Sequence, residues 1–394
     1  MNFPVILEKE FKTRIKRFKQ KMSDNKLDLV VIYSNLLDPS SVRYLSDVSP
    51  INESAAIVIP LEGEPILCSG QACHEWSKFK SKIKDVRILP EVGEVSGVEY
   101  DIEDQMDFKD LFKEIKTKYY IKKIGIIGEL IFPYVIYRKL ESVFENIQIT
   151  NCEQLIYELR MQKSKDEREC IKKAGRIISD TFSFAVDRIK PGYTELDIQA
   201  DIESQMLKLG AEAYCNSFAP MVPSGNDNSN LCMNRNTLRK ISGGEIVDLQ
   251  AGSLYEGYNA VICAPFVLGK IPQEIKDAVK AAFEAEKMVV DAMKPGATSI
   301  ELFEVYNNFL KKERYEKFSP YGSVHSLGML ECESPFFSSK KEVVMLEDMA
   351  IAIDVYFKGM SWGSFRIEDT YIIKKNGAEL VTSFNEKFIP ENFF

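Results

Sequence analysis

The sequence has no long hydrophobic run and no clustered cysteines, and each absence argues against a class of protein. No stretch approaches 18 consecutive apolar residues, and residues 1–10 have no apolar core behind a basic start, so we expect neither a membrane span nor a signal peptide. The 8 cysteines form no CxxC pair and no zinc-ribbon spacing, which indicates buried, reduced thiols. We therefore expect a cytoplasmic protein with no membrane partner.

The chain also has no excess of basic charge. Lys and Arg total 51 against 59 Asp and Glu, which gives a formal charge of -8. Nucleic acids and anionic membranes select for clustered Lys and Arg, so we expect no nucleic-acid partner. The basic runs at 11–17 and 78–84 are interpreted as solvated faces.

The apolar residues that are present predict an α/β domain over residues 1–155. The chain has 394 residues, 45% of them apolar, which is enough for two domains. Apolar spacing predicts helices and short apolar runs predict strands, and the two alternate along the chain. The helices are expected at 14–22 and 108–116, and the strands at 27–33, 54–60, 66–68 and 124–127.

Residues 156–394 predict a second, α+β domain. A helical pattern begins at Asp166 and is stopped by Pro191 and Gly192, and the segment Thr194-Glu-Leu-Asp197 has the composition of a helix N-terminus. Later helices are expected at 273–293 and 299–312, and strands at 246–249, 260–267, 349–356 and 368–374.

Three short stretches in this second domain carry a His, an Asp and a Glu in the order of a hydrolase metal site. They contain His325, Asp354 and Glu368. The only other histidine, His74, lies in the first domain, so His325 is the candidate acid/base imidazole of the second. Asp369, next to Glu368, is a further site candidate.

Several motifs resemble one family. The segments 159–167, 189–195 and 223–225 are similar, in order and spacing, to those of the pita-bread hydrolases that include creatinase, aminopeptidase P and prolidase. The resemblance covers nearly the whole chain. It implies an α/β N-terminal domain plus an α+β pita-bread (creatinase/aminopeptidase-like) C-terminal domain, and a homodimer.

The resemblance also implies that the metal site is altered. The metal-binding members hold two divalent ions with two aspartates, a histidine and two glutamates, and they use the ions to activate a water. The two aspartate positions fall here on Gln250 and Val261, and the other three on His325, Asp354 and Glu368. We therefore expect no resident cofactor, although the three remaining ligands leave open a single divalent ion.

Cys232 falls where creatinase, which works without a metal, carries its acid/base histidine. In one interpretation its thiolate is a nucleophile assisted by His325, with Asp354 or Glu368 orienting the imidazole. In the other, Cys232 only fills space left by a lost histidine. The catalytic candidates are therefore His325, Glu368, Asp354 and Cys232.

Other residues are candidates for the substrate pocket. Gln250 and Val261 stand at the lost ligand positions, and the remaining candidates flank the motifs. The expected substrate-binding residues are Gln250, Tyr258, Val261, Glu333, Phe336 and Arg366.

The leading hypothesis is a metal-independent or single-metal enzyme, related to creatinase and prolidase, that acts on a C–N bond of a small polar molecule. Specialised metabolite biosynthesis would suit such an altered site. A catalytically inactive pita-bread binding module is the alternative. A two-metal Xaa-Pro peptidase ranks third because it needs both lost aspartates.

Overall fold

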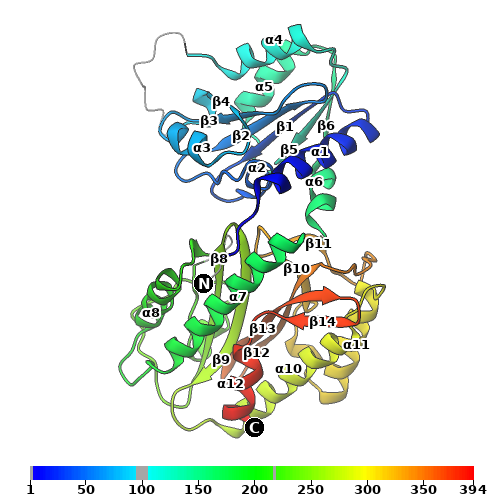
Figure 1. Ribbon diagram of the computed structural model, residues 1–394. Helices are drawn as coiled ribbons and strands as arrows, with labels where there is room; N and C mark the ends of the chain where they lie inside the picture. The colour runs from blue at the N-terminus through cyan, green and yellow to red at the C-terminus, as the bar shows by residue number, and fades with distance from the viewer. Residues whose placement is uncertain (1–2, 95–104, 216–218) are drawn as a thin grey trace. The chain divides into compact units, whose positions relative to one another are not determined.

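The computed structural model describes residues 3–94, 105–215 and 219–394, and the chain forms two compact units (Figure 1). One unit is Leu7–Arg160. The other is Met161–Phe394 together with Met1–Ile6.

The N-terminal unit is built on a six-stranded sheet of order β4-β3-β2-β1-β5-β6. Strand β1 pairs in parallel with β5 and antiparallel with β2, so the sheet is mixed. The strands are β1 (Leu29–Ser34), β2 (Ala55–Pro60), β3 (Ile66–Ser69), β4 (Asp85–Ile88), β5 (Lys123–Ile127) and β6 (Gln148–Asn151). The helices are α1 (Glu8–Asp24), α2 (Ser40–Ser46), α3 (His74–Lys80), α4 (Phe108–Lys118), α5 (Tyr134–Val143) and α6 (Glu153–Arg160). This is the expected α/β architecture.

The first unit ends with α6, beyond the expected boundary at residue 155. Leu155, Ile156 and Leu159 are buried, and α6 packs against α1 of the same unit. Because burial of this apolar face needs α1, the whole helix belongs to the first unit. The division therefore falls between Arg160 and Met161.

The C-terminal unit contains an eight-stranded sheet of order β11-β10-β12-β13-β9-β8-β7, with β14 paired to β13. The strands are β7 (Ala213–Tyr214), β8 (Ile246–Tyr255), β9 (Tyr258–Val267), β10 (Val324–Ser326), β11 (Glu333–Phe336), β12 (Ala350–Met360), β13 (Gly363–Lys374) and β14 (Gly377–Leu380). The helices are α7 (Lys165–Val186), α8 (Glu195–Lys208), α9 (Gly225–Ser229), α10 (Gln273–Ala292), α11 (Ser299–Glu313) and α12 (Phe384–Phe393). This is the expected α+β pita-bread domain.

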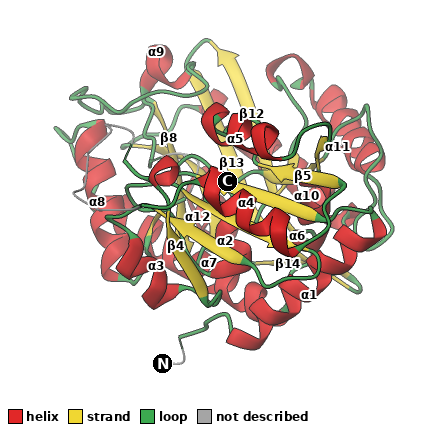
Figure 2. Cartoon of the chain, turned by 90° about the horizontal axis from the view of Figure 1, so that it is seen from above, coloured by secondary structure: helices red, strands yellow, loops and turns green. Residues whose placement is uncertain are grey.

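Two long helices cover one face of this sheet. Ser253 on β8 donates a hydrogen bond to the Ala174 carbonyl of α7, and Tyr371 on β13 donates to Glu286 of α10. The C-terminal helix α12 packs beside α7 and α10, where the chain ends (Figures 1 and 2). We call this covered side the helix face, and the other side the open face.

Local sequence fixes where these elements begin and turn. Ser164 and Glu167 form a capping box at the start of α7, and Thr194 and Asp197 form another at the start of α8. The β8–β9 hairpin turns at Glu256 and Gly257, which have φ values of 47° and 82°. Two positive φ values are typical of a tight hairpin turn, and the turn sets the pairing register of the two strands.

Among the described residues, no helix is long and apolar enough to cross a membrane.

Candidate active site

A row of polar side chains crosses four neighbouring strands of the C-terminal sheet. The register pairs Gln250 with Cys263, Cys263 with Glu368, and Glu368 with Asp354. Paired residues direct their side chains to the same side of a sheet. These four side chains therefore lie together on the open face, although their strands are far apart in the sequence.

The neighbouring row brings His325 to the same place. His325 pairs with Ala352, which is two residues before Asp354 on β12 and therefore shares its face. Val261, two residues before Cys263 on β9, belongs to this row and is fully buried. Its isopropyl group offers no ligand atom at the position where the metal-binding pita-bread hydrolases carry an aspartate.

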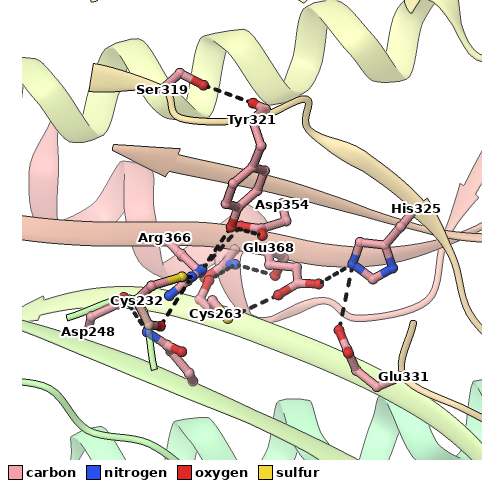
Figure 3. Close-up of polar contacts among 12 residues, drawn as sticks. Cys232, Asp248, Cys263, Ser319, Tyr321, His325, Glu331, Asp354, Arg366 and Glu368 are labelled. Carbon is pink, nitrogen blue, oxygen red and sulfur yellow. Dashed lines mark hydrogen bonds and ion pairs between the residues drawn. The ribbon is translucent and has the colours of Figure 1, made fainter. Parts of the chain in front are cut away.

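His325 lies between two carboxylates (Figure 3). Its Nε2 is 3.2 Å from Glu368 Oε1 and 3.6 Å from Glu331 Oε1. Burial alone would lower the pKa of His325, but hydrogen bonds with Cys332 and Glu368 and the charge of Glu331 outweigh it, so the net pKa lies well above its ordinary value. One ring nitrogen of His325 and one carboxylate oxygen each of Glu331 and Glu368 lie within 4.8 Å of one another, which is close enough to hold a metal ion.

Asp354 is engaged by other groups. Tyr321 donates a 2.5 Å hydrogen bond to Asp354 Oδ2, and Arg366 Nε lies 3.6 Å from Oδ1 (Figure 3). Burial and the charge of Glu368 raise the pKa of Asp354 to about 6, while Arg366 opposes the shift. The Arg366 guanidinium also lies over the Tyr356 ring, 3.9 Å from its centroid.

Gln250 is held by a residue outside the predicted set. Its Nε2 donates a 2.7 Å hydrogen bond to Asp248 Oδ2, and both side chains are buried. Burial raises the pKa of Asp248 to about 7, against the opposing charge of Arg366. Asp248 shares the face of Gln250 because the two are two residues apart on β8. Asp248 is therefore part of the polar network of the site.

Some polar atoms in this network have no hydrogen-bond partner within the described parts of the chain. They are Asp248 Oδ1, Asp354 Oδ1 and Arg366 Nη1. Buried polar atoms are nearly always satisfied by protein, water or ligand, so we expect water or a polar ligand group beside them.

Two cysteines near the site, Cys263 and the predicted Cys232, occupy different places. Cys263 is buried and donates to Glu368 Oε2 at 3.1 Å, and burial raises its thiol pKa well above the ordinary value. Cys232 is exposed, and its Sγ lies 3.3 Å from Arg366 Nη2. The thiol of Cys232 therefore contacts Arg366, whereas the nucleophile hypothesis depended on a contact with His325 (Figure 3).

Three sequence-based assignments need correction. Tyr258 lies on the helix face, where its hydroxyl donates to Glu167 of α7, so its side chain points away from the predicted substrate pocket. Asp369 also points to the helix face, because adjacent strand residues alternate, and it accepts from Thr382. Glu333 forms a buried ion pair with Lys163, so its carboxylate binds a side chain of the protein and not a substrate.

Phe336 is 60% exposed and is paired with His325 across β10 and β11. It stays a predicted pocket residue.

The sequence motifs did not single out Tyr321 or Glu331. Glu331 stands in the segment that follows His325, whereas no motif marked Tyr321.

Comparison with known proteins identifies the class of protein. The model of the creatinase/prolidase N-terminal domain matches residues 14–162, and that of metallopeptidase family M24 matches residues 169–375. This chain belongs to metallopeptidase family M24 and has the two-domain creatinase/prolidase architecture.

Particular relatives cover nearly the whole chain. It is 27% identical to the Xaa-Pro dipeptidase of Pyrococcus furiosus, over 96% of this chain and 100% of that one. It is 28% identical to the Xaa-Pro dipeptidase of Pyrococcus horikoshii, over 95% and 98%.

Solved structures of similar proteins have the same fold as this chain. The prolidase from Pyrococcus horikoshii OT3 has a TM-score of 0.79 at 27% identity and covers 94% of this chain and 98% of its own. An X-Pro aminopeptidase from Thermotoga maritima has a TM-score of 0.81 at 24% identity over 93% and 97%, which shows the shared fold.

Proposed function

We propose that this chain is a hydrolase that cleaves the C–N bond of a small, peptide-like substrate, with one divalent ion or none in place of a metal pair. The observation that carries the proposal is the convergence of His325, Glu368 and Asp354 on the open face of one sheet. Membership of family M24 and the dipeptidase names of the relatives support amide hydrolysis.

The residues present do not fit a pair of ions. Gln250 directs its amide donor at Asp248, and Val261 is an apolar side chain with no exposed surface. Neither can supply the negative charge that two dications between the carboxylates require. A metal pair therefore has no part in the proposed reaction. The dipeptidase names of the relatives favour peptidase activity over specialised biosynthesis.

Asp354 is the proposed base. Tyr321 fixes its Oδ2, and its Oδ1 has no hydrogen-bond partner in the described part of the chain. In hydrolysis, Oδ1 would accept a proton from the attacking water and return it to the leaving nitrogen as the C–N bond breaks. Arg366 acts as a positioning residue, because its guanidinium lies beside Asp354 and holds the carboxylate in place.

His325 and Glu368 lie on the other side of the site from Arg366, and we propose that they orient the scissile carbonyl group. A divalent ion bound there would polarise that carbonyl as a Lewis acid. Phe336, exposed beside His325, offers an apolar wall for a substrate side chain.

A substrate panel tests this proposal. The purified full-length chain is incubated with Xaa-Pro dipeptides, other dipeptides and tripeptides, with chelator or with Mn²⁺, and released amines are quantified. We expect hydrolysis of at least one dipeptide, and Asp354→Asn to lower kcat by about 10²–10⁴-fold with little change in KM. Tyr258→Phe, on the helix face, is the matched control and should keep wild-type turnover.

Two negative results would each contradict part of this proposal. If the folded protein hydrolyses no member of the panel under either condition, the non-catalytic binding module becomes the better account. If Asp354→Asn retains wild-type kcat, the assignment of the base is wrong.

The homodimer is also a prediction, based on the resemblance to the creatinase and prolidase branch. Light scattering should give twice the chain mass of 45.0 kDa. A single-chain mass at micromolar concentration would contradict it.

A further inference from the structure

The contacts of His325 point to a ligand that the sequence motifs did not define. Its Nε2 faces Glu368 Oε1 at 3.2 Å and Glu331 Oε1 at 3.6 Å. The three ligand atoms lie within 4.8 Å of one another. A nitrogen and two carboxylate oxygens therefore converge on one point.

The other ring nitrogen indicates which atom is free to bind. Nδ1 lies 3.2 Å from the carbonyl oxygen of Ser326. A carbonyl oxygen only accepts, so in the neutral imidazole this contact places the proton on Nδ1 and leaves the lone pair of Nε2 directed at the two carboxylates. Metal-binding histidines are commonly oriented by such a contact to a backbone carbonyl.

The spacing suits a small divalent ion. Nitrogen and carboxylate ligands lie about 2.0–2.2 Å from such an ion, so neighbouring ligand atoms are about 3.0–3.5 Å apart. The contacts of Nε2 with Glu368 and Glu331, at 3.2 and 3.6 Å, agree with that separation to within a few tenths of an ångström.

Asp354 is the carboxylate that the sequence favoured as the third ligand of a single ion, but its surroundings oppose that role. Tyr321 donates to its Oδ2, and the Arg366 guanidinium lies 3.6 Å from its Oδ1. A metal ion bound at Asp354 would be repelled by the positive charge of the Arg366 guanidinium. Glu331, in the segment between β10 and β11, instead faces His325.

We propose that His325, Glu331 and Glu368 bind one divalent cation, and that Glu331 is a ligand in place of the carboxylates lost at Gln250 and Val261. One imidazole with two carboxylates suits Mn²⁺, Fe²⁺, Co²⁺ or Zn²⁺. The site deepens the proposed function and rests on it for its catalytic meaning, but ion binding can be measured without any substrate.

The test is a titration of metal-free, full-length protein with Mn²⁺, followed by calorimetry and electron paramagnetic resonance. We expect one equivalent of Mn²⁺ per chain, with electron spin echo modulation from one coordinated imidazole nitrogen. His325→Ala should remove that modulation. Glu331→Gln should weaken binding by at least about tenfold, since losing even an outer-shell partner costs about 10–100-fold.

Tyr258→Phe is the control, because the Tyr258 hydroxyl lies on the helix face and donates to Glu167, away from the three proposed ligands. It should bind Mn²⁺ as tightly as the wild type. Circular dichroism checks that each variant is folded. If Glu331→Gln does not fold, Glu331→Asp, shortened by one methylene, should show the same weakening.

Three results would overturn the inference. They are no binding of Mn²⁺ or Zn²⁺ at millimolar concentration, two equivalents per chain, or unchanged affinity in the folded Glu331 variant. Ion binding without hydrolysis of any substrate would count against the proposed function alone. Hydrolysis by a chain that binds no ion would count against this inference alone.

Discussion

Replacing Glu333 by Gln should destabilise the C-terminal unit strongly. Glu333 Oε1 lies 2.9 Å from Lys163 Nζ, and the two side chains are only 3% and 2% exposed. Removing one partner of a buried pair takes that partner's compensating charge away from the other in a medium of low polarity, which costs about 3–5 kcal/mol. For a unit of this size, the thermal midpoint should fall by about 6–20 °C.

Fluorescence can report on this unit alone. Trp362 lies in the C-terminal unit and Trp76 in the N-terminal unit, and the chain has 2 tryptophans. In a Trp76→Phe background, urea unfolding followed by fluorescence therefore measures the free energy of unfolding of the unit that contains Glu333.

A double variant provides the control. Lys163→Met with Glu333→Leu replaces the charged pair by apolar side chains and should recover most of the lost stability, because no lone charge stays buried. A loss below about 1 kcal/mol for Glu333→Gln, as for an exposed pair, would refute this reasoning. Unchanged stability with a raised KM would restore Glu333 as a substrate contact.

Three further predictions concern other polar contacts. Tyr321→Phe should lower kcat about 10–100-fold in steady-state assays, because Asp354 loses a hydrogen bond to a charged acceptor worth about 1.5–3 kcal/mol; an unchanged kcat would argue against Asp354 as the base. Cys232→Ser should keep near wild-type turnover, because Cys232 contacts Arg366 through its sulfur; complete loss would indicate a thiolate nucleophile. Hydrogen bonds from Arg87 and Lys118 lower the pKa of Glu114 to about 2, so its stabilising contribution is present above the unfolded pKa, about 4.3, and is lost as pH falls toward 2. Glu114→Gln should therefore reduce the acid sensitivity of the N-terminal unit in urea titrations from pH 5 to 2.5, and an unchanged pH profile would contradict this.

The elements that the sequence predicted well are those with local causes. The capping box at Thr194 lies within four residues of chain, so its sequence alone marks the start of the helix. The strands expected at 246–249 and 260–267 are present as β8 and β9, but the structure extends them to the tight turn that joins them, and the sequence did not predict their pairing.

The candidate site was predicted in part. The order of His325, Asp354 and Glu368 was enough to expect them together, and the structure brings them to one face of the sheet. Asp369 was wrongly included, although the two-residue period of a strand already implies that it points away from Glu368. Tyr321 lies in the segment before β10, where no periodic pattern fixes the direction of a side chain.

The sequence by itself determined which ligand atoms this protein lacks, since Gln250 and Val261 cannot become carboxylates in any conformation. Only the tertiary structure decided which groups meet. Cys263 reaches Glu368 across 105 positions of chain, and Arg366 reaches Asp354 across paired strands. Such contacts depend on strand order and register, which the packing of the whole sheet sets and no local pattern encodes.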